Sequence, residues 1–175
     1  MIKKNELHSL IQSWENLAIV ANHISEYPEH LDVLINLALD DKEHRNWRAA
    51  WMIDRIHEKH PELVLAFLPV ITDFVLTTRN SGKKRHLLKI ISLHPVPGEK
   101  VATMLDFCIE VFSNTKEPIA VRVHAMQILY NITTQEPDFA RELTELIERE
   151  MEYHGSAGMS SRGRKLLKKL YLMSQ

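Results

Sequence analysis

Residues 61–93 most restrict what this chain can fold into, because they place two apolar stretches on either side of one polar turn. The first stretch is apolar on most sides and contains Pro69, and the second has leucines and isoleucines at 87–91 with helical spacing. The turn, Asn-Ser-Gly at 80–82, consists of residue types common in chain reversals. The segment is therefore predicted to be a helical hairpin. One hairpin cannot bury this much apolar surface alone, so the rest of the chain is expected to repeat it and stack on it.

Helical patterns continue along the whole chain, and no convincing strand pattern occurs. Only five glycines are present in 175 residues, and prolines stand at four predicted helix starts, Pro28, Pro61, Pro118 and Pro137. The sequence predicts an all-α chain of about ten helices in antiparallel pairs. It is expected to form one domain over 1–175, with an N-terminal helical cap at 1–27 and about four hairpins at 28–175. Pro69 is expected to kink the helix at 61–77, residues 94–98 to form the strongest break, and residues 155–158 to form a loop.

A basic residue recurs near the start of the second helix in each predicted pair. The arginines are Arg48, Arg85, Arg122 and Arg164, with spacings of 37, 37 and 42 residues. Such a period, with two helices per unit, indicates an α-solenoid. The apolar residues around Arg122 also recur 76 positions earlier, and that offset pairs Arg122 with Asn46 instead of Arg48. Since burial fixes helix orientation more strongly than one charge does, Arg48 is left outside the predicted series.

Two segments resemble repeats of the HEAT family of armadillo-like α-solenoids. Residues 66–93, AFLPVITDFVLTTRNSGKKRHLLKIISL, contain the Leu-Pro pair at 68–69 that such repeats often carry in the first helix. Residues 121–129, VRVHAMQIL, match the second-helix pattern of a basic residue followed by small and apolar positions. The resemblance implies a short α-α superhelix of HEAT-like hairpins. It also implies a non-catalytic scaffold whose concave face, lined by the second helices, binds a protein or peptide.

The predicted helix at 42–59 carries the main candidates for a partner-binding site. Its predicted core stripe is Ala49, Met52, Ile53 and Ile56. If this stripe faces the core, Trp47 and Trp51 project to the opposite side, with arginines beside them. Tryptophan and arginine are enriched at binding hot spots, although the N-terminal helices could instead pack on this face and cover both indoles. The residues predicted to contact a partner are Trp47, Arg48, Trp51, Arg55, Lys84, Arg85 and Arg122.

A function of a different class is the alternative. Some small proteins that resemble HEAT arrays are DNA glycosylases that act on alkylated bases, using tryptophan, aspartate and arginine in a basic groove. Trp47, Trp51, Asp54 and Arg55 supply those residue types. The chain is short for that class, its charge is balanced, and no family motif matches residue by residue. A third interpretation is a purely structural subunit of a larger assembly.

No residue pattern points to a metal, a cofactor or a catalytic nucleophile. His57 and His60 are three residues apart, but no third ligand follows in the sequence, and histidines suit a helix C-terminus. Cys108 lies in an apolar stripe, as expected for a buried structural thiol. A Gly-rich phosphate loop, a Gly-x-Ser-x-Gly motif and a CxxC pair are all absent. The sequence therefore favours a protein without catalysis, cofactor or metal.

Charge is balanced in total but uneven along the chain. The 22 basic and 23 acidic residues give a net charge of −1, which does not favour nucleic acid as a partner. Basic residues cluster at 83–89 and 162–169, and acidic residues at 142–152. Either the last two helices pair through these charges, or a basic concave patch holds phosphates or an acidic partner.

Targeting signals are not apparent in the sequence. The single cysteine excludes an internal disulfide and fits a reducing compartment. No run of 18 apolar residues and no signal-peptide pattern occurs, so a cytoplasmic chain without membrane contact is expected. The oligomeric state is not indicated.

Overall fold

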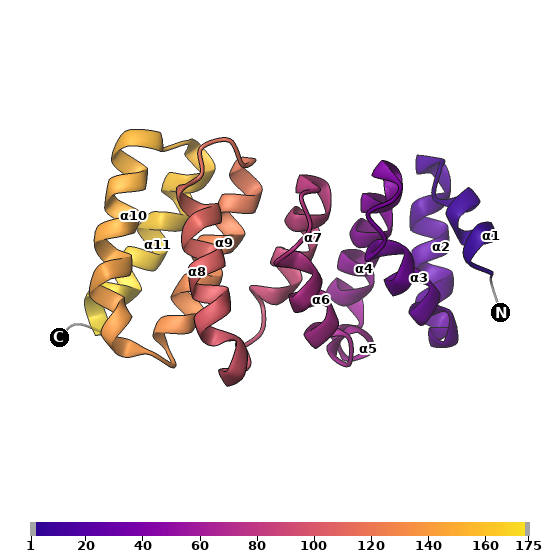
Figure 1. The fold of residues 1–175 in the computed structure, drawn as a ribbon, viewed down its shortest axis with the longest axis horizontal. Helices are drawn as coiled ribbons and strands as arrows, with labels where there is room; N and C mark the ends of the chain where they lie inside the picture. The colour runs from indigo at the N-terminus through magenta and orange to yellow at the C-terminus, as the bar shows by residue number, and fades with distance from the viewer. Residues whose placement is uncertain (1–2, 174–175) are drawn as a thin grey trace. The chain divides into compact units, whose positions relative to one another are not determined.

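The computed structural model describes residues 3–173, apart from the side chain of His44, and within that range the chain is all-α (Figure 1). Eleven α-helices and four short 3₁₀ turns, but no strand, occur among these residues, which confirms the predicted fold class. The helices are α1 (Lys4–Leu10), α2 (Trp14–Glu26), α3 (Leu31–Ala38), α4 (Trp47–Lys59), α5 (Pro61–Leu65), α6 (Leu68–Val75), α7 (Ser81–Ile91), α8 (Val101–Ser113), α9 (Ile119–Thr133), α10 (Ala140–His154) and α11 (Ala157–Met173). The 3₁₀ turns are Pro28–His30, His44–Asn46, Gly98–Lys100 and Pro137–Phe139.

Three helix boundaries differ from those predicted, and the simplest difference is that α4 begins at Trp47 and not at residue 42. The predicted helix at 61–77 is interrupted between Leu65 and Leu68, so Pro69 lies in the first turn of α6 and does not kink a continuous helix. Proline is well accommodated there, because the first backbone N–H groups of a helix have no helical partner. The predicted loop at 155–158 is also too long, since α11 already begins at Ala157.

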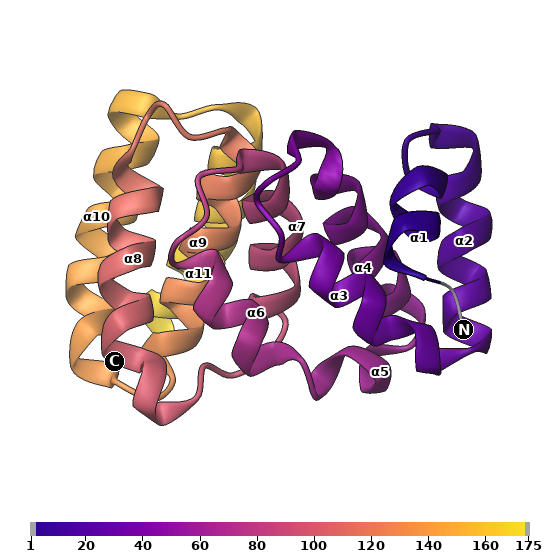
Figure 2. The ribbon, with the colours of Figure 1, turned by 45° about the vertical axis from the view of Figure 1, so that its right-hand side comes forward.

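The chain divides into two compact units, Met1–Ile90 and Ile91–Gln175, and the division falls just before the predicted break at 94–98. In unit 1, α4 packs against α2, α3 and α5, while α1 packs against α3. The predicted stripe of α4 forms part of this core, because all four of its apolar side chains are buried. In unit 2, α9 packs against α8 and α11, and α10 packs against α11 (Figure 2).

In unit 1, basic side chains near the start of α4 and α7 bind carbonyl oxygens just after earlier helices. The Arg48 guanidinium donates to the Ile11 carbonyl oxygen at 2.9 Å, beyond the end of α1. Lys83, which has no exposed surface, donates from Nζ to the Asp40 carbonyl oxygen at 2.7 Å, beyond the end of α3, and pairs with the Asp41 carboxylate at 2.7 Å. Cations are favoured at helix C-termini, where carbonyl groups lack helical partners.

A basic residue of unit 2 also binds a carbonyl oxygen at a helix end, but within its own hairpin. Arg122, near the start of α9, donates from Nε to the Phe112 carbonyl oxygen at 2.8 Å, in the last turn of α8. Arg48 and Lys83 reach back to the chain after the first helix of the preceding hairpin, whereas Arg122 binds the first helix of its own hairpin, so these contacts do not place Arg48 and Arg122 in one series. In α7 the contact is made by Lys83 and not by Arg85, which is exposed. The repeat of this contact is consequently less regular than the arginine spacing suggested.

Gly155 connects α10 to α11 at a point of close backbone approach. A Cβ atom at this position would lie 2.2 Å from the Met151 carbonyl oxygen, so the backbone would have to shift. Gly155→Ala is therefore expected to lower the free energy of unfolding by about 1–3 kcal/mol in urea titrations followed by circular dichroism. Gly98→Ala is the control, because a Cβ atom there meets nothing within 4 Å. Equal stability of the two variants would contradict the expectation.

Candidate binding surface

All three tryptophans of the chain meet on one surface of unit 1, where the start of α2 lies against α4. The Trp14 ring centroid lies 5.4 Å from that of Trp47 and 5.9 Å from that of Trp51, in both cases edge to face. Trp14 is 52% exposed, and the other two indoles are half-buried. The N-terminal helices thus cover Trp47 and Trp51 only in part. Trp14 was not among the predicted contact residues, because its contribution to this surface depends on how two helices pack.

Arg48 and Arg55 both lie over these indoles, but their surroundings differ. The Arg48 guanidinium is 5.1 Å from the Trp14 ring centroid and is half-buried, since it also binds the chain between α1 and α2. The Arg55 guanidinium is exposed, lies 5.4 Å from the Trp51 ring centroid and pairs with Glu58 at 2.7 Å. Arg48 therefore links α4 to Trp14 and to the chain after α1, whereas Arg55 presents a cation on an aromatic face to the surroundings.

A groove of about 340 Å³ runs between α2 and α4 beside Trp51. Its lining residues are Ala18, Ala21, Asn22, Ser25, Trp51, Arg55, Ile56 and Lys59. The groove exists because α2 presents small side chains to α4 at positions three or four residues apart. Arg55 and Lys59 supply two cations, and no carboxylate lines the groove. The site therefore combines apolar walls with positive charge.

Beneath this surface, Asp54 connects α4 to α7. Its carboxylate is buried, accepts a hydrogen bond from His86 Nδ1 at 2.9 Å and forms an ion pair with Lys89 at 2.8 Å. Lys89 also reaches Glu58 at 2.6 Å, and the His86 ring stacks on Trp47 with centroids 6.3 Å apart. The network fixes the orientation of α4, and hence of the tryptophans, relative to α7.

The pKa values in this network reflect burial opposed by ion pairing. Burial alone raises the pKa of Asp54, but the contacts with His86 and Lys89 outweigh it and hold that pKa below its ordinary value. The hydrogen bond from Lys89 likewise lowers the pKa of Glu58. Burial lowers the pKa of Lys89, yet Asp54 and Glu58 outweigh it, and the net shift is upward. All three groups are therefore charged in the folded protein at neutral pH.

These shifts predict that unit 1 loses stability in acid. Because the pKa values of Asp54 and Glu58 are lower in the folded chain, their contribution is present above about pH 4 and is lost as the pH falls through the folded-state values. The raised pKa of Lys89 has no effect in acid, because its contribution is lost only as the pH rises above about 10.5. For Asp54→Asn, the midpoint of unfolding, monitored by tryptophan emission, is expected to decrease less steeply than in wild type as the pH is lowered. A midpoint that decreases as steeply as in wild type would contradict this role of Asp54.

The remaining predicted contact residues lie in different surroundings. On α7, Arg85 is exposed and Lys84 is half-buried. In unit 2, Arg122 is only 4% exposed, and its guanidinium binds the Glu150 carboxylate at 2.8 Å as well as the Phe112 carbonyl oxygen. These contacts use its donors inside unit 2, so Arg122 is left out of the surface proposed below.

Comparison with protein families identifies the architecture. A family model described as HEAT repeat domain matches residues 3–170. The chain belongs to the HEAT repeat family. No curated protein and no solved structure gives a significant match. In this HEAT domain, the second helices of the hairpins after the first are α4, α7, α9 and α11.

The sequence also drew attention to Cys108 and to possible metal ligands. Burial raises the pKa of the Cys108 thiol far above its ordinary value, so the reactive thiolate is disfavoured. Between residues 3 and 173, no three side chains of His, Cys, Asp or Glu come together in a way that could hold a metal ion. In the same range, no helix has both the length and the apolar character needed to cross a bilayer.

Proposed function

We propose that this HEAT domain is a non-catalytic binding module that holds a short acidic segment of a protein partner in the groove between α2 and α4. The observation that carries the proposal is the position of Trp51 and Arg55 on the wall of an apolar groove. Its volume is near the lower end of the range for ligand pockets, roughly 300–1,000 Å³. An anchor of one or two apolar side chains from an extended peptide suits this size.

The charges of the groove indicate which residues of the bound peptide should flank its apolar anchor. Arg55 and Lys59 lie on its walls, and Lys59 Nζ donates to Asn22 Oδ1 at 3.0 Å while its side chain remains exposed. Beyond α4, the exposed Arg85 on α7 adds positive charge to unit 1. Aspartate or glutamate next to the anchor is therefore favoured, and lysine or arginine there is opposed.

The surroundings of Asp54 favour binding over base excision. The glycosylase alternative requires tryptophan, aspartate and arginine on one open surface. Trp51 and Arg55 are available there, but Asp54 is buried and engaged by His86 and Lys89. The tryptophan surface thus has aromatic and cationic groups suited to recognition, without a free carboxylate from Asp54.

Selection from a random peptide library displayed on phage tests this function. The wild-type domain is expected to enrich peptides with an aromatic or branched aliphatic residue next to Asp or Glu. Ala18→Phe should abolish this enrichment, because Ala18 is exposed and lines the groove, so a larger side chain fills it without entering the core. Ala102→Phe, at an exposed position of α8, is the matched control and should enrich the same peptides as wild type.

The same peptide selection can also contradict the proposed function. The proposal would be wrong if the wild-type domain enriched no consensus, or if Ala18→Phe enriched the same peptides as Ala102→Phe. Enrichment of basic peptides would also contradict it, because Arg55 and Lys59 would repel them.

A further inference from the structure

Charge is divided between the two helices of each hairpin after the first. The first helices α3, α5, α6, α8 and α10 carry ten acidic and two basic residues. The second helices α4, α7, α9 and α11 carry thirteen basic and two acidic residues. The total charge of −1 conceals this division. Some of these basic residues, such as Lys83 and Arg122, are buried and paired, so the exposed positive charge has to be located helix by helix.

The last helix of unit 2 shows the division most clearly. Five basic residues and no acidic residue lie in α11, and we call these five the basic strip: Arg162, Arg164, Lys165, Lys168 and Lys169. All five are exposed. The apolar side of α11, including Leu166 and Leu170, is buried in unit 2, where the helix packs on α9 and α10. The strip is thus the outward side of a helix whose apolar side is already occupied.

Two acidic residues of α10, Glu145 and Glu150, form ion pairs that do not involve the basic strip. Glu150 binds Arg122 of α9 and His154 of α10, with the His154 contact at 3.1 Å. Glu145 pairs with Arg141 at 3.2 Å within α10. These ion pairs lie within α10 or join α10 to α9. The simpler expectation was that α10 and α11 pair through their opposite charges, and these contacts do not follow it.

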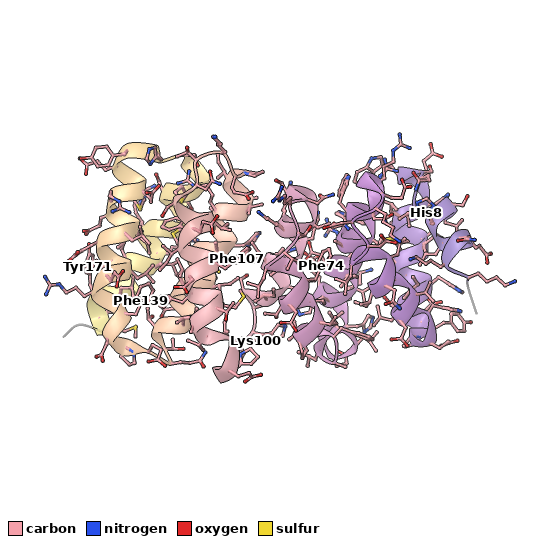
Figure 3. The ribbon with its side chains drawn as sticks, in the orientation of Figure 1. His8, Phe74, Lys100, Phe107, Phe139 and Tyr171 are labelled. Atoms are coloured by element: carbon pink, nitrogen blue, oxygen red, sulfur yellow. The ribbon has the colours of Figure 1, made fainter. Side chains whose placement is uncertain are left out.

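Glu148 makes a contact that does reach α11. It accepts a hydrogen bond from the hydroxyl of Tyr171, labelled in Figure 3, and this bond raises the pKa of that phenol. A neutral hydroxyl supplies the donor, so the cations of the basic strip stay uncompensated by this contact.

Polar and aromatic groups of α9 border the basic strip. Lys169 Nζ lies 5.3 Å from the centroid of the half-buried Tyr130 ring, and Arg162 donates to Gln127 Oε1 at 2.7 Å. Arg162 and Lys169 are seven residues apart, or about 10 Å along the helix at roughly 1.5 Å per residue. Cations at this separation can contact successive phosphates of one strand, while a neighbouring aromatic ring can stack on a base.

We propose that the basic strip and Tyr130 form a binding site for the backbone of single-stranded nucleic acid. Charge complementarity supports a polyanion, and the tyrosine ring beside the cations favours one that carries aromatic bases. An acidic peptide is less suited, because it gains nothing specific from the ring. An anionic membrane is also less suited, because Leu166, Leu167 and Leu170 of α11 are packed inside unit 2 and cannot insert, which leaves exposed apolar surface on this helix at its end, at residues 171–173.

Fluorescence anisotropy with a labelled oligothymidine of about 20 nucleotides tests the site, in salt from about 50 to 300 mM. Lys165→Glu/Lys168→Glu removes two phosphate contacts. The slope of log K against log salt should become less steep by about 1.4, and affinity at about 0.1 M salt should fall at least roughly 25-fold. Lys116→Glu/Arg141→Glu changes the net charge equally at exposed positions of unit 2 outside α11 and should retain affinity. Circular dichroism verifies folding, and Lys165→Gln/Lys168→Gln provides a milder variant with the same direction of effect.

Tyr130→Leu separates stacking from charge alone. It should weaken oligothymidine binding several-fold and leave the salt slope unchanged. The proposal would be overturned by absence of binding at the lowest salt, by equal losses in the two charge-reversal variants, or by an unchanged affinity in Tyr130→Leu. Equal or tighter binding to polyglutamate of the same charge would assign the strip to acidic proteins. Binding to phosphatidylserine vesicles without binding to the oligonucleotide would assign it to membranes, and tighter binding to duplex DNA would exclude the single-stranded preference.

Discussion

Arg122→Met is expected to lower the free energy of unfolding by about 3–5 kcal/mol. The guanidinium is 4% exposed, donates to the Phe112 carbonyl oxygen and binds the Glu150 carboxylate at 2.8 Å. Methionine has similar bulk but no donor, so it leaves a buried carbonyl oxygen and a buried carboxylate without their main partner. Urea unfolding followed by circular dichroism measures the loss.

A second variant distinguishes loss of the ion pair from loss of packing. Arg122→Met/Glu150→Leu removes both charges, and it should regain a large part of the stability that Arg122→Met loses. His154 and Arg149 also contact Glu150, at 3.1 and 3.8 Å, and they limit the cost of the single change toward the lower end of the range. A single variant within about 1 kcal/mol of wild type, or a double variant less stable than the single, would contradict this account.

Trp51→Ala is expected to weaken binding of a peptide enriched by the domain by about 30-fold or more, or about 2 kcal/mol. Trp51 forms a wall of the groove, and its ring also supports the Arg55 guanidinium, 5.4 Å from the ring centroid. Removing the indole therefore removes apolar contact and releases the cation that would face the acidic residue of the peptide. Isothermal titration calorimetry gives the affinity.

The control for Trp51→Ala is Tyr153→Ala, which removes an aromatic ring that is 68% exposed in unit 2. It should bind the peptide as wild type does. Trp51→Phe should lie between wild type and Trp51→Ala, because a smaller ring retains part of the wall and of the cation–π contact. Wild-type affinity in a folded Trp51→Ala protein would remove Trp51 from the site.

The helices and their pairing followed largely from apolar periodicity and from prolines, because both act within one helix or one turn. The proline at position 69 did not show whether one helix is kinked there or a new helix begins, since its fixed φ suits an interior kink and a first turn alike. Three adjacent cations at 83–85 posed a similar problem. Periodicity does not select the buried one, and only packing against α3 and α6 places Lys83 inside, where its Nζ lies 5.1 Å from the Phe74 ring centroid (Figure 3).

The binding surface was only partly accessible from the sequence. The apolar stripe of α4 oriented Trp47 and Trp51 away from the core. Trp14 lies seven residues after Leu7, a spacing typical of one face of a single helix, but in the structure it begins α2. Its contact with α4 joins residues more than thirty positions apart. The groove depends likewise on small side chains of α2 meeting α4, and one sequence contains no signal for such a pairing.

The most direct test of the binding module uses its own tryptophans. Because Trp14, Trp47 and Trp51 are the three tryptophans of the chain and all lie in one cluster, intrinsic emission reports only on this surface. Titration with an enriched acidic peptide that lacks tryptophan should shift the emission to shorter wavelength along a saturable curve, because the peptide excludes water from Trp51. Ala18→Phe should abolish the shift, and Ala102→Phe should retain it. Calorimetric binding of the same peptide without any change in emission would place its site elsewhere and contradict the account.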